Sequence, residues 1–232
     1  MKLRVKFNKR NYLKYISHLD LMRLFQRSLN MAKIPVEYSK GFNPQPKLSI
    51  ASPLSLGIAS EEEYMDLELI EKIDLENFKE DMNNILPKDV QIISCIYPEN
   101  NISIASMISW GLYEVIFEIE SLKNKSEINT SLNRWINQDT IIISRFRKKG
   151  RKKILKDEDI KSLIKELNII DLDKKQVKLQ AILKVGENGN LRPLDFVEAF
   201  YRDNDLTIIK DSIRIKRIGL FVEEGDTLHR PF

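Results

Sequence analysis

Hydrophobic and polar residues alternate with a period of two at the start of the chain. Leu3, Val5 and Phe7 are each followed by a polar residue, and this alternation predicts a half-buried strand over residues 3–9. The intervening residues include two cations, which give the strand a basic outer face. The chain is therefore expected to begin with an element that has one apolar and one charged side.

The spacing changes to that of a helix over residues 18–33. Apolar residues recur three and four positions apart, at Leu21, Leu24, Phe25, Leu29 and Ala32. Ser17 and Asp20 have the spacing of a capping box at the helix start, and a following proline prevents the helix from continuing. Arg23 and Arg27 lie on the opposite stripe, so the predicted helix carries cations on its polar side.

The rest of the first hundred residues consists of short, strongly patterned segments. They predict strands at 36–39, 64–70 and 90–98, a strand-like stretch at 47–54 and a helix at 75–86. The glutamates at 61–63 are expected to form a solvated turn. The overall order, strand, helix, two strands, helix and strand, is that of the ferredoxin-like unit. We therefore predict a ferredoxin-like domain over residues 1–100.

The second half repeats this order with an insertion. Its patterns predict a strand at 111–120, a helix at 126–138, a basic hairpin at 140–156, a short helix at 157–170, a strand and turn at 174–193, a helix at 194–202 and a strand at 211–223. Without the hairpin and the short helix, the order is again ferredoxin-like. The predicted fold class is thus α+β, with two tandem ferredoxin-like domains, the second over residues 106–232.

The composition is that of a globular protein with enough apolar residues for a core. Hydrophobic residues make up 42% of the 232 residues and charged residues 31%. A single cysteine, Cys95, excludes an internal disulfide and any zinc site or cluster built from cysteines of this chain alone. We expect no metal and no cofactor. No apolar run reaches about 18 residues, so we expect a cytoplasmic protein without a membrane span.

Charge is unevenly distributed along the chain, although the net charge is only +4. Residues 1–60 hold eleven Lys/Arg and two Asp/Glu, whereas residues 61–105 hold three Lys/Arg and twelve Asp/Glu. An asymmetry of this kind can leave a basic face that attracts a polyanion.

Residues 38–47 form the first candidate binding site, called loop 38–47 below. Its two prolines fix the backbone and extend the residues before them, and Gly41 can adopt a positive φ at no steric cost. A loop restricted in this way loses little entropy on binding. Its side chains suit a phosphate backbone and a stacked base, namely Tyr38, Lys40, Phe42, Asn43 and Lys47. The alternative is a rigid connection between two strands, with Phe42 packed inward.

A basic run supplies the second candidate contact. Residues 145–156 contain eight cations and no acid, and such runs are often nucleic-acid patches. The candidate phosphate ligands are Arg145, Arg147, Lys148, Lys149, Arg151, Lys152 and Lys153. A solvated hairpin tip is the alternative interpretation.

His18 stands at the start of the first predicted helix. Close to Tyr38 or Lys40, it could act as a general base on a ribose hydroxyl. The helix N-terminus could also bind a phosphate there. The alternative is a surface or capping histidine.

The stretches SHLD, at 17–20, and GFNPQPK, at 41–47, carry a family resemblance. The chain resembles the radical-SAM-linked protein family, a bacterial family of unknown function in which some members are fused to, or encoded beside, a radical SAM protein. The similarity is densest over residues 3–69 and weaker to about residue 223. It implies an accessory role near radical SAM and RNA-processing or translation genes, with a radical SAM protein as partner.

The order of elements is also similar to that of the CRISPR repeat-processing endoribonucleases. That similarity implies two tandem ferredoxin-like domains and, in many members, metal-independent RNA cleavage by a histidine. Only Gly219 and Gly225 stand where those enzymes have a glycine-rich loop. Our leading hypothesis is a non-catalytic RNA-binding or adaptor protein linked to a radical SAM enzyme, in RNA or ribosome modification. The alternatives are an endoribonuclease that uses His18 and a pure protein-interaction module.

Overall fold

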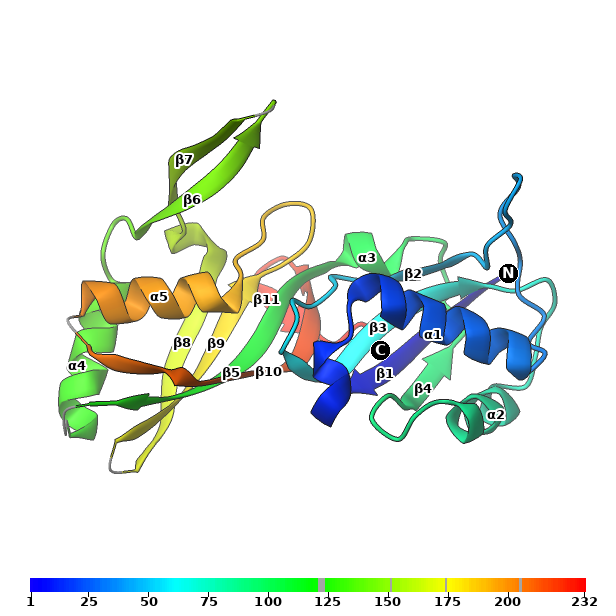
Figure 1. Ribbon diagram of the computed structural model, residues 1–232, viewed down its shortest axis with the longest axis horizontal. Coiled ribbons are helices and arrows are strands. Elements are labelled where there is room, and N and C mark those ends of the chain that lie inside the picture. The colour runs from blue at the N-terminus through cyan, green and yellow to red at the C-terminus, as the bar shows by residue number, and fades with distance from the viewer. Residues whose placement is uncertain (121–123, 151, 174, 205) are drawn as a thin grey trace. The chain divides into compact units, whose positions relative to one another are not determined.

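The computed structural model describes residues 1–120, 124–150, 152–173, 175–204 and 206–232. The chain divides into two compact units (Figure 1). Unit 1 consists of Met1–Trp110 and Lys216–Phe232, and unit 2 of Gly111–Ile215. The predicted domain limits follow the order of the chain, whereas unit 1 includes the C-terminal segment. Helices and sheet strands occur in both units, which confirms the α+β class.

Unit 1 contains its main elements in the predicted order. They are β1 (Lys2–Lys9), α1 (His18–Met31), β2 (Leu48–Ile50), β3 (Ala59–Glu68), α2 (Leu75–Ile85) and β4 (Ile92–Ile96), with the short helices η1 (Asn11–Tyr15) and α3 (Ile104–Met107) between or after them. The strand expected at 36–39 is wrong, because Val36 and Tyr38 form isolated bridges with Leu69 and Pro46. Loop 38–47 therefore connects α1 to β2 and does not connect two strands.

The sheet of unit 1 is organised around β1 and β3. β1 pairs in antiparallel fashion with β4 on one side and β3 on the other. Two strands share the far edge of β3, because β2 pairs with its C-terminal half and β10 (Ile208–Glu224) runs parallel to its start at Ala59 and Ser60. β11 (Thr227–His229) then pairs with β10. The glutamates at 61–63 lie inside β3, so the predicted solvated turn is wrong.

The apolar side of β1 faces α1 and α2 (Figure 1). Leu3, Val5 and Phe7 are fully buried, as their alternation predicted, and the Phe7 ring packs edge-on against Phe25 of α1 with centroids 4.9 Å apart. Ser17 caps α1 by accepting a hydrogen bond from the Asp20 amide, which confirms the predicted helix start. The core of unit 1 thus lies between one face of the sheet and two capped helices.

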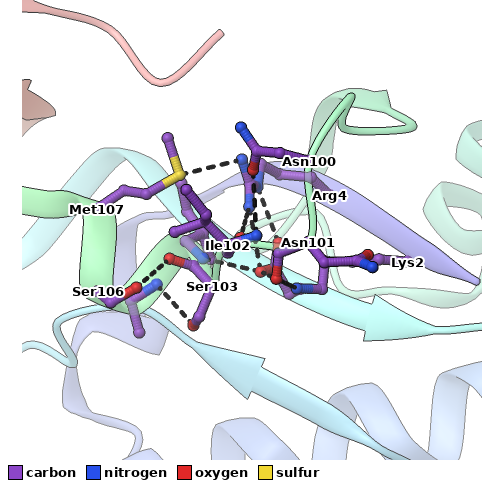
Figure 2. A network of polar contacts seen from close by, with 11 residues as sticks. Lys2, Arg4, Asn100, Asn101, Ile102, Ser103, Ser106 and Met107 are labelled. Atoms are coloured by element: carbon purple, nitrogen blue, oxygen red, sulfur yellow. Dashed lines mark hydrogen bonds and ion pairs between the residues drawn. The ribbon is translucent and has the colours of Figure 1, made fainter.

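The opposite face of this sheet carries a polar network, shown in Figure 2. Side chains alternate across a strand, so Arg4 points away from the helices. Its Nε donates to Asp66 Oδ1 at 2.9 Å and its Nη2 donates to the Ile102 carbonyl at 2.7 Å. The Ile104 amide donates to Asp66 Oδ2 at 2.8 Å. This buried ion pair therefore holds the segment that leads into α3 against the sheet.

Unit 2 contains β5 (Ile108–Ile119), α4 (Lys125–Ile136), β6 (Ile142–Lys149), β7 (Lys152–Asp159), η2 (Lys161–Leu163), β8 (Ile164–Asp173), β9 (Gln176–Lys184), α5 (Pro193–Asp203) and the first part of β10, with β5 starting in unit 1. Its strand order is β10-β5-β9-β8, and β6–β7 form a separate hairpin. The core centres on Trp135, whose ring packs edge-on against Phe196 and Phe200.

The short helix predicted at 157–170 is wrong, since this segment is mainly the ends of β7 and β8. Its apolar residues have helical spacing, and Ile164 and Leu167 are both buried. A shift in register between Ile164 and Glu166 explains the pattern, because a bulge lets residues three positions apart point to the same side of a strand.

Candidate nucleic-acid interface

Loop 38–47 is closed at its base by several hydrogen bonds. The Ser39 amide donates to the Gln45 carbonyl at 2.9 Å, and the Gln45 amide donates to Ser39 Oγ at 3.0 Å. The Tyr38 hydroxyl donates to Asn30 Oδ1 of α1 at 2.6 Å. The loop is therefore fixed both across its own base and against the helix before it.

The tip of the loop presents its side chains to solvent. Phe42 is fully exposed, with 112% relative accessibility, so the alternative in which it packs inward is wrong. Gly41 and Asn43 are also exposed. Lys40 is exposed too and has no ion-pair partner among the residues that the structure describes. An aromatic ring and a cation thus stand together on a braced loop.

Lys47, at the end of the loop, is in a different situation. Its Nζ lies 2.6 Å from Glu37 Oε1 and 3.3 Å from Glu68 Oε2. The hydrogen bond to Glu37, followed by that to Glu68, raises the pKa of the Lys47 ammonium. A phosphate would have to compete with two carboxylates for this cation, so its predicted contact is the weakest of the loop.

The exposed side of α1 continues the surface of the loop. Arg27 is exposed and, within the described part of the chain, has no ion-pair partner. Arg23 is also exposed, although its Nη1 lies 3.0 Å from Asp20 Oδ1 in the preceding turn. Residues four apart lie on one helical face, and Asn30 joins this face to the loop through Tyr38.

Much of the charge asymmetry in the sequence disappears in the folded unit. Arg4 pairs with Asp66, Arg10 with Glu61, and Lys47 with Glu68. The N-terminal cations and the acids of β3 therefore neutralise one another across the sheet. Arg27 on the outer side of α1 and Lys40 at the tip of loop 38–47 are among the exposed cations that keep no ion-pair partner within the described residues.

The basic run forms the hairpin β6–β7, with its turn at Gly150. Arg145 is largely buried, and its Nη2 lies 2.6 Å from Asp195 Oδ2 on α5. Together with Glu158, these residues line a cavity of about 690 Å³ between the hairpin and α5. Five other predicted contacts, the side chains of Arg147, Lys148, Lys149, Lys152 and Lys153, lie outside what the structure describes, as does the whole of Arg151.

His18 lies at the first residue of α1 and is exposed. It lines a small cavity together with Lys9, Leu54 and Glu63, and loop 38–47 contributes no residue to that lining. Glu63 is itself buried and accepts two hydrogen bonds from Arg217 of β10. Sequence reasoning missed this group, although the alternation that buries Leu3, Val5 and Phe7 also turns Lys9 inward.

Gly219 and Gly225, which stand where the CRISPR endoribonucleases have a glycine-rich loop, have structural roles here. A Cβ at Gly219, within β10, would overlap the guanidinium of Arg230, which pairs with Glu62. Gly225 forms the turn before β11 with a φ of +59°. Both positions therefore belong to the β10–β11 hairpin.

Two observations on the described ranges concern metal binding and membrane spans. No three His, Cys, Asp or Glu side chains there are grouped so that they could hold a metal ion. None of the helices there has both the length and the apolar character needed to cross a bilayer.

Two solved structures share this fold at low sequence identity. A chain of the crystal structure of a Cbf5–Nop10–Gar1 complex matches with a TM-score of 0.53 and 7% identity, covering 93% of this chain and 47% of its own length. A chain of the structure of an H/ACA RNP bound to a substrate RNA containing 2′-deoxyuridine matches with a TM-score of 0.52 and 8% identity. That match covers 93% of this chain and 46% of the other chain. The chain spans less than half the length of either, and identities this low show the fold alone.

Sequence comparison gives the family. No curated protein matches the chain. A family profile with the description "Uncharacterized protein conserved in bacteria (DUF2344)" matches residues 2–193, which is most of the chain. The chain therefore belongs to this bacterial family.

Proposed function

We propose that the protein binds single-stranded RNA through loop 38–47 and the exposed side of α1. The observation that carries the proposal is the fully exposed Phe42 at the tip of a loop whose base is fixed by hydrogen bonds. An exposed aromatic side chain on a rigid loop can stack on a base with little loss of entropy. Lys40 and Arg27 would hold the adjacent phosphates.

The fold comparison supports the same class of ligand. One of the two matching structures is an H/ACA RNP bound to a substrate RNA. The order of strands and helices in each unit also supports the proposal that both are ferredoxin-like, since β10-β5-β9-β8 in unit 2 parallels β4-β1-β3-β2 in unit 1. Sheets of this kind are a common platform for RNA recognition.

Fluorescence anisotropy with a labelled single-stranded RNA tests this proposal. Phe42→Ala should lower affinity by about 1–3 kcal/mol, the usual contribution of one base–aromatic stack, whereas Phe42→Tyr should retain most of it. Arg27→Gln and Lys40→Gln should each reduce the salt dependence of binding by about 0.7 in log–log slope, the value for one phosphate contact on a single strand.

Lys88→Gln is the matched control, since Lys88 is exposed in unit 1 and lies outside α1 and loop 38–47. Its salt slope should equal that of the unmodified protein. Undetectable binding to total cellular RNA at low salt would disprove the RNA proposal. Cleavage of the RNA during the assay, abolished by His18→Ala, would instead favour the endoribonuclease alternative.

We further propose that the protein acts as an adaptor for a radical SAM enzyme, as the family resemblance implies. Crosslinking in the native cell, followed by identification of both RNA and protein, tests this part separately. Recovery of a radical SAM protein would support it. Recovery of RNA alone would leave the RNA-binding function and remove the adaptor role, and recovery of other proteins alone would favour a protein-interaction module.

A further inference from the structure

The last residue of β1 is a lysine on the apolar side of the sheet. Lys9 is in phase with Leu3, Val5 and Phe7, and it is only 3% exposed. The register of β1 against β3 shifts between Phe7 and Lys9 because β3 has one extra residue between Glu63 and Ser60, so β1 keeps its alternation and Lys9 stays on the apolar side. A buried ammonium normally lies next to a carboxylate or a set of hydrogen-bond acceptors, because its desolvation is costly.

Among the residues that the structure describes, Lys9 lacks such a partner. Within the described part of the chain, no oxygen accepts a hydrogen bond from its Nζ and no carboxylate lies within 4.0 Å of it. Glu63 is the nearby acid, but its two oxygens accept the hydrogen bonds of Arg217. Burial, opposed by Glu63 and reinforced by Arg217, lowers the pKa of the Lys9 ammonium. The fold therefore keeps a largely buried amine beside an acid that is already bonded to Arg217.

The unpartnered lysine lines a cavity that leads to the start of a helix. The cavity has a volume of about 10 Å³ and is also lined by His18, Leu21 and Glu63. Space of this size holds a single water molecule or one oxygen atom of a larger group. His18 is the first residue of α1, which has fourteen residues, and the first turn of a helix has N–H groups without intrahelical acceptors. Of these, the Asp20 amide is already bonded to Ser17 Oγ.

We propose that this site binds a phosphate group, with one oxygen entering the cavity to meet Lys9 and the others held at the mouth by His18 and the first turn of α1. An ammonium, an imidazole and a helix N-terminus are all donors that favour an oxyanion. The site is distinct from loop 38–47, and its existence does not depend on the RNA proposal.

Calorimetric titration with inorganic phosphate, at an ionic strength kept constant with chloride, tests the site. The unmodified protein should bind phosphate saturably at one site, and Lys9→Met and His18→Asn should each weaken binding about tenfold or more. Lys9→Met keeps the length of the side chain, and removing a buried ammonium that has no ion pair among the described residues should not lower stability in phosphate-free buffer. His18→Asn alters an exposed residue and should therefore fold normally. It still tests the phosphate site if Lys9→Met misfolds.

Lys88→Met is the matched control and should bind phosphate like the unmodified protein. A pair of short RNAs, one with a 5′-phosphate and one with a 5′-hydroxyl, distinguishes a terminal RNA phosphate from a free one. A preference for the phosphorylated RNA that disappears in Lys9→Met would support the site with RNA as its source. The proposal is overturned if neither inorganic phosphate nor the phosphorylated RNA binds in a way that depends on Lys9 and His18.

Discussion

Arg217 and Glu63 form a buried ion pair between residues that are 154 positions apart in the sequence. Arg217 Nε donates to Glu63 Oε1 at 2.8 Å, and its Nη2 donates to the second carboxylate oxygen and to the Ser52 carbonyl. Both side chains are almost completely buried. The pair joins the C-terminal part of β10 to the middle of β3 inside unit 1.

Glu63→Gln should therefore be strongly destabilising. It leaves the Arg217 guanidinium buried without its counter-charge. Removing one partner of such a pair lowers the free energy of unfolding by about 3–5 kcal/mol. Urea unfolding measures the loss. Glu61→Gln, two residues away on the same strand but facing Arg10 in a partly exposed pair, should cost less than about 1 kcal/mol. Equal losses for the two variants would contradict the structure.

The buried amine of Lys9 should make stability depend on alkaline pH. Its folded-state pKa is lowered by burial, whereas the unfolded chain has the ordinary value of 10.5. Between these two values the unfolded chain binds more protons, so the free energy of unfolding rises with pH. Urea unfolding from neutral pH to about 10 should show this rise in the unmodified protein relative to Lys9→Met. Parallel pH profiles would show that the amine is not desolvated.

Cys95 should react slowly with thiol reagents in the folded protein. Burial, and then the nearby charge of Glu76, raise the pKa of its thiol to about 11. At pH 8 its thiolate fraction should be about a hundredfold below that of an ordinary cysteine. The rate of reaction with an aromatic disulfide measures this, with the urea-unfolded chain as the reference. Equal rates in the two states would disagree with the burial of the sulfur.

Loss of the Arg145 side chain should loosen the contact between the hairpin β6–β7 and α5 in unit 2. Arg145→Met removes the ion pair with Asp195 on α5, in which both side chains are largely buried, and should therefore weaken the attachment of the hairpin to this helix. Hydrogen exchange of the β6 and β7 amides should accelerate. Lys156→Met is the control, because Lys156 lies opposite Arg145 in the hairpin and is exposed. It should leave exchange unchanged.

Hydrophobic periodicity was sufficient to predict most elements of the fold. The alternation in β1 and the four-residue spacing in α1 reflect one buried face each, and the cap at Ser17 depends on local chemistry alone. The helix expected at 157–170 failed because a bulged strand can bury residues three positions apart. The strand expected at 36–39 failed because only isolated bridges form there.

The candidate site was predicted less completely, because its charges depend on tertiary contacts. The sequence indicated Phe42 and Lys40 through the composition of loop 38–47, but it could not show that Lys47 faces Glu37 and Glu68. Glu63 looked like part of a solvated acidic run, and its burial depends on Arg217 far along the chain. Lys9, in contrast to Glu63, carried a local signal, since the strand period already placed it on the apolar side.

Unit 1 is formed by two segments that lie far apart in the sequence, and this has a consequence for its synthesis on the ribosome. β3 emerges early, but the strand that pairs with its start, and the arginine that neutralises Glu63, emerge only after all of unit 2. Until then the nascent N-terminal segment has an open sheet edge and an unmatched acid at its core. Unit 1 is therefore begun before unit 2 during synthesis and completed after it.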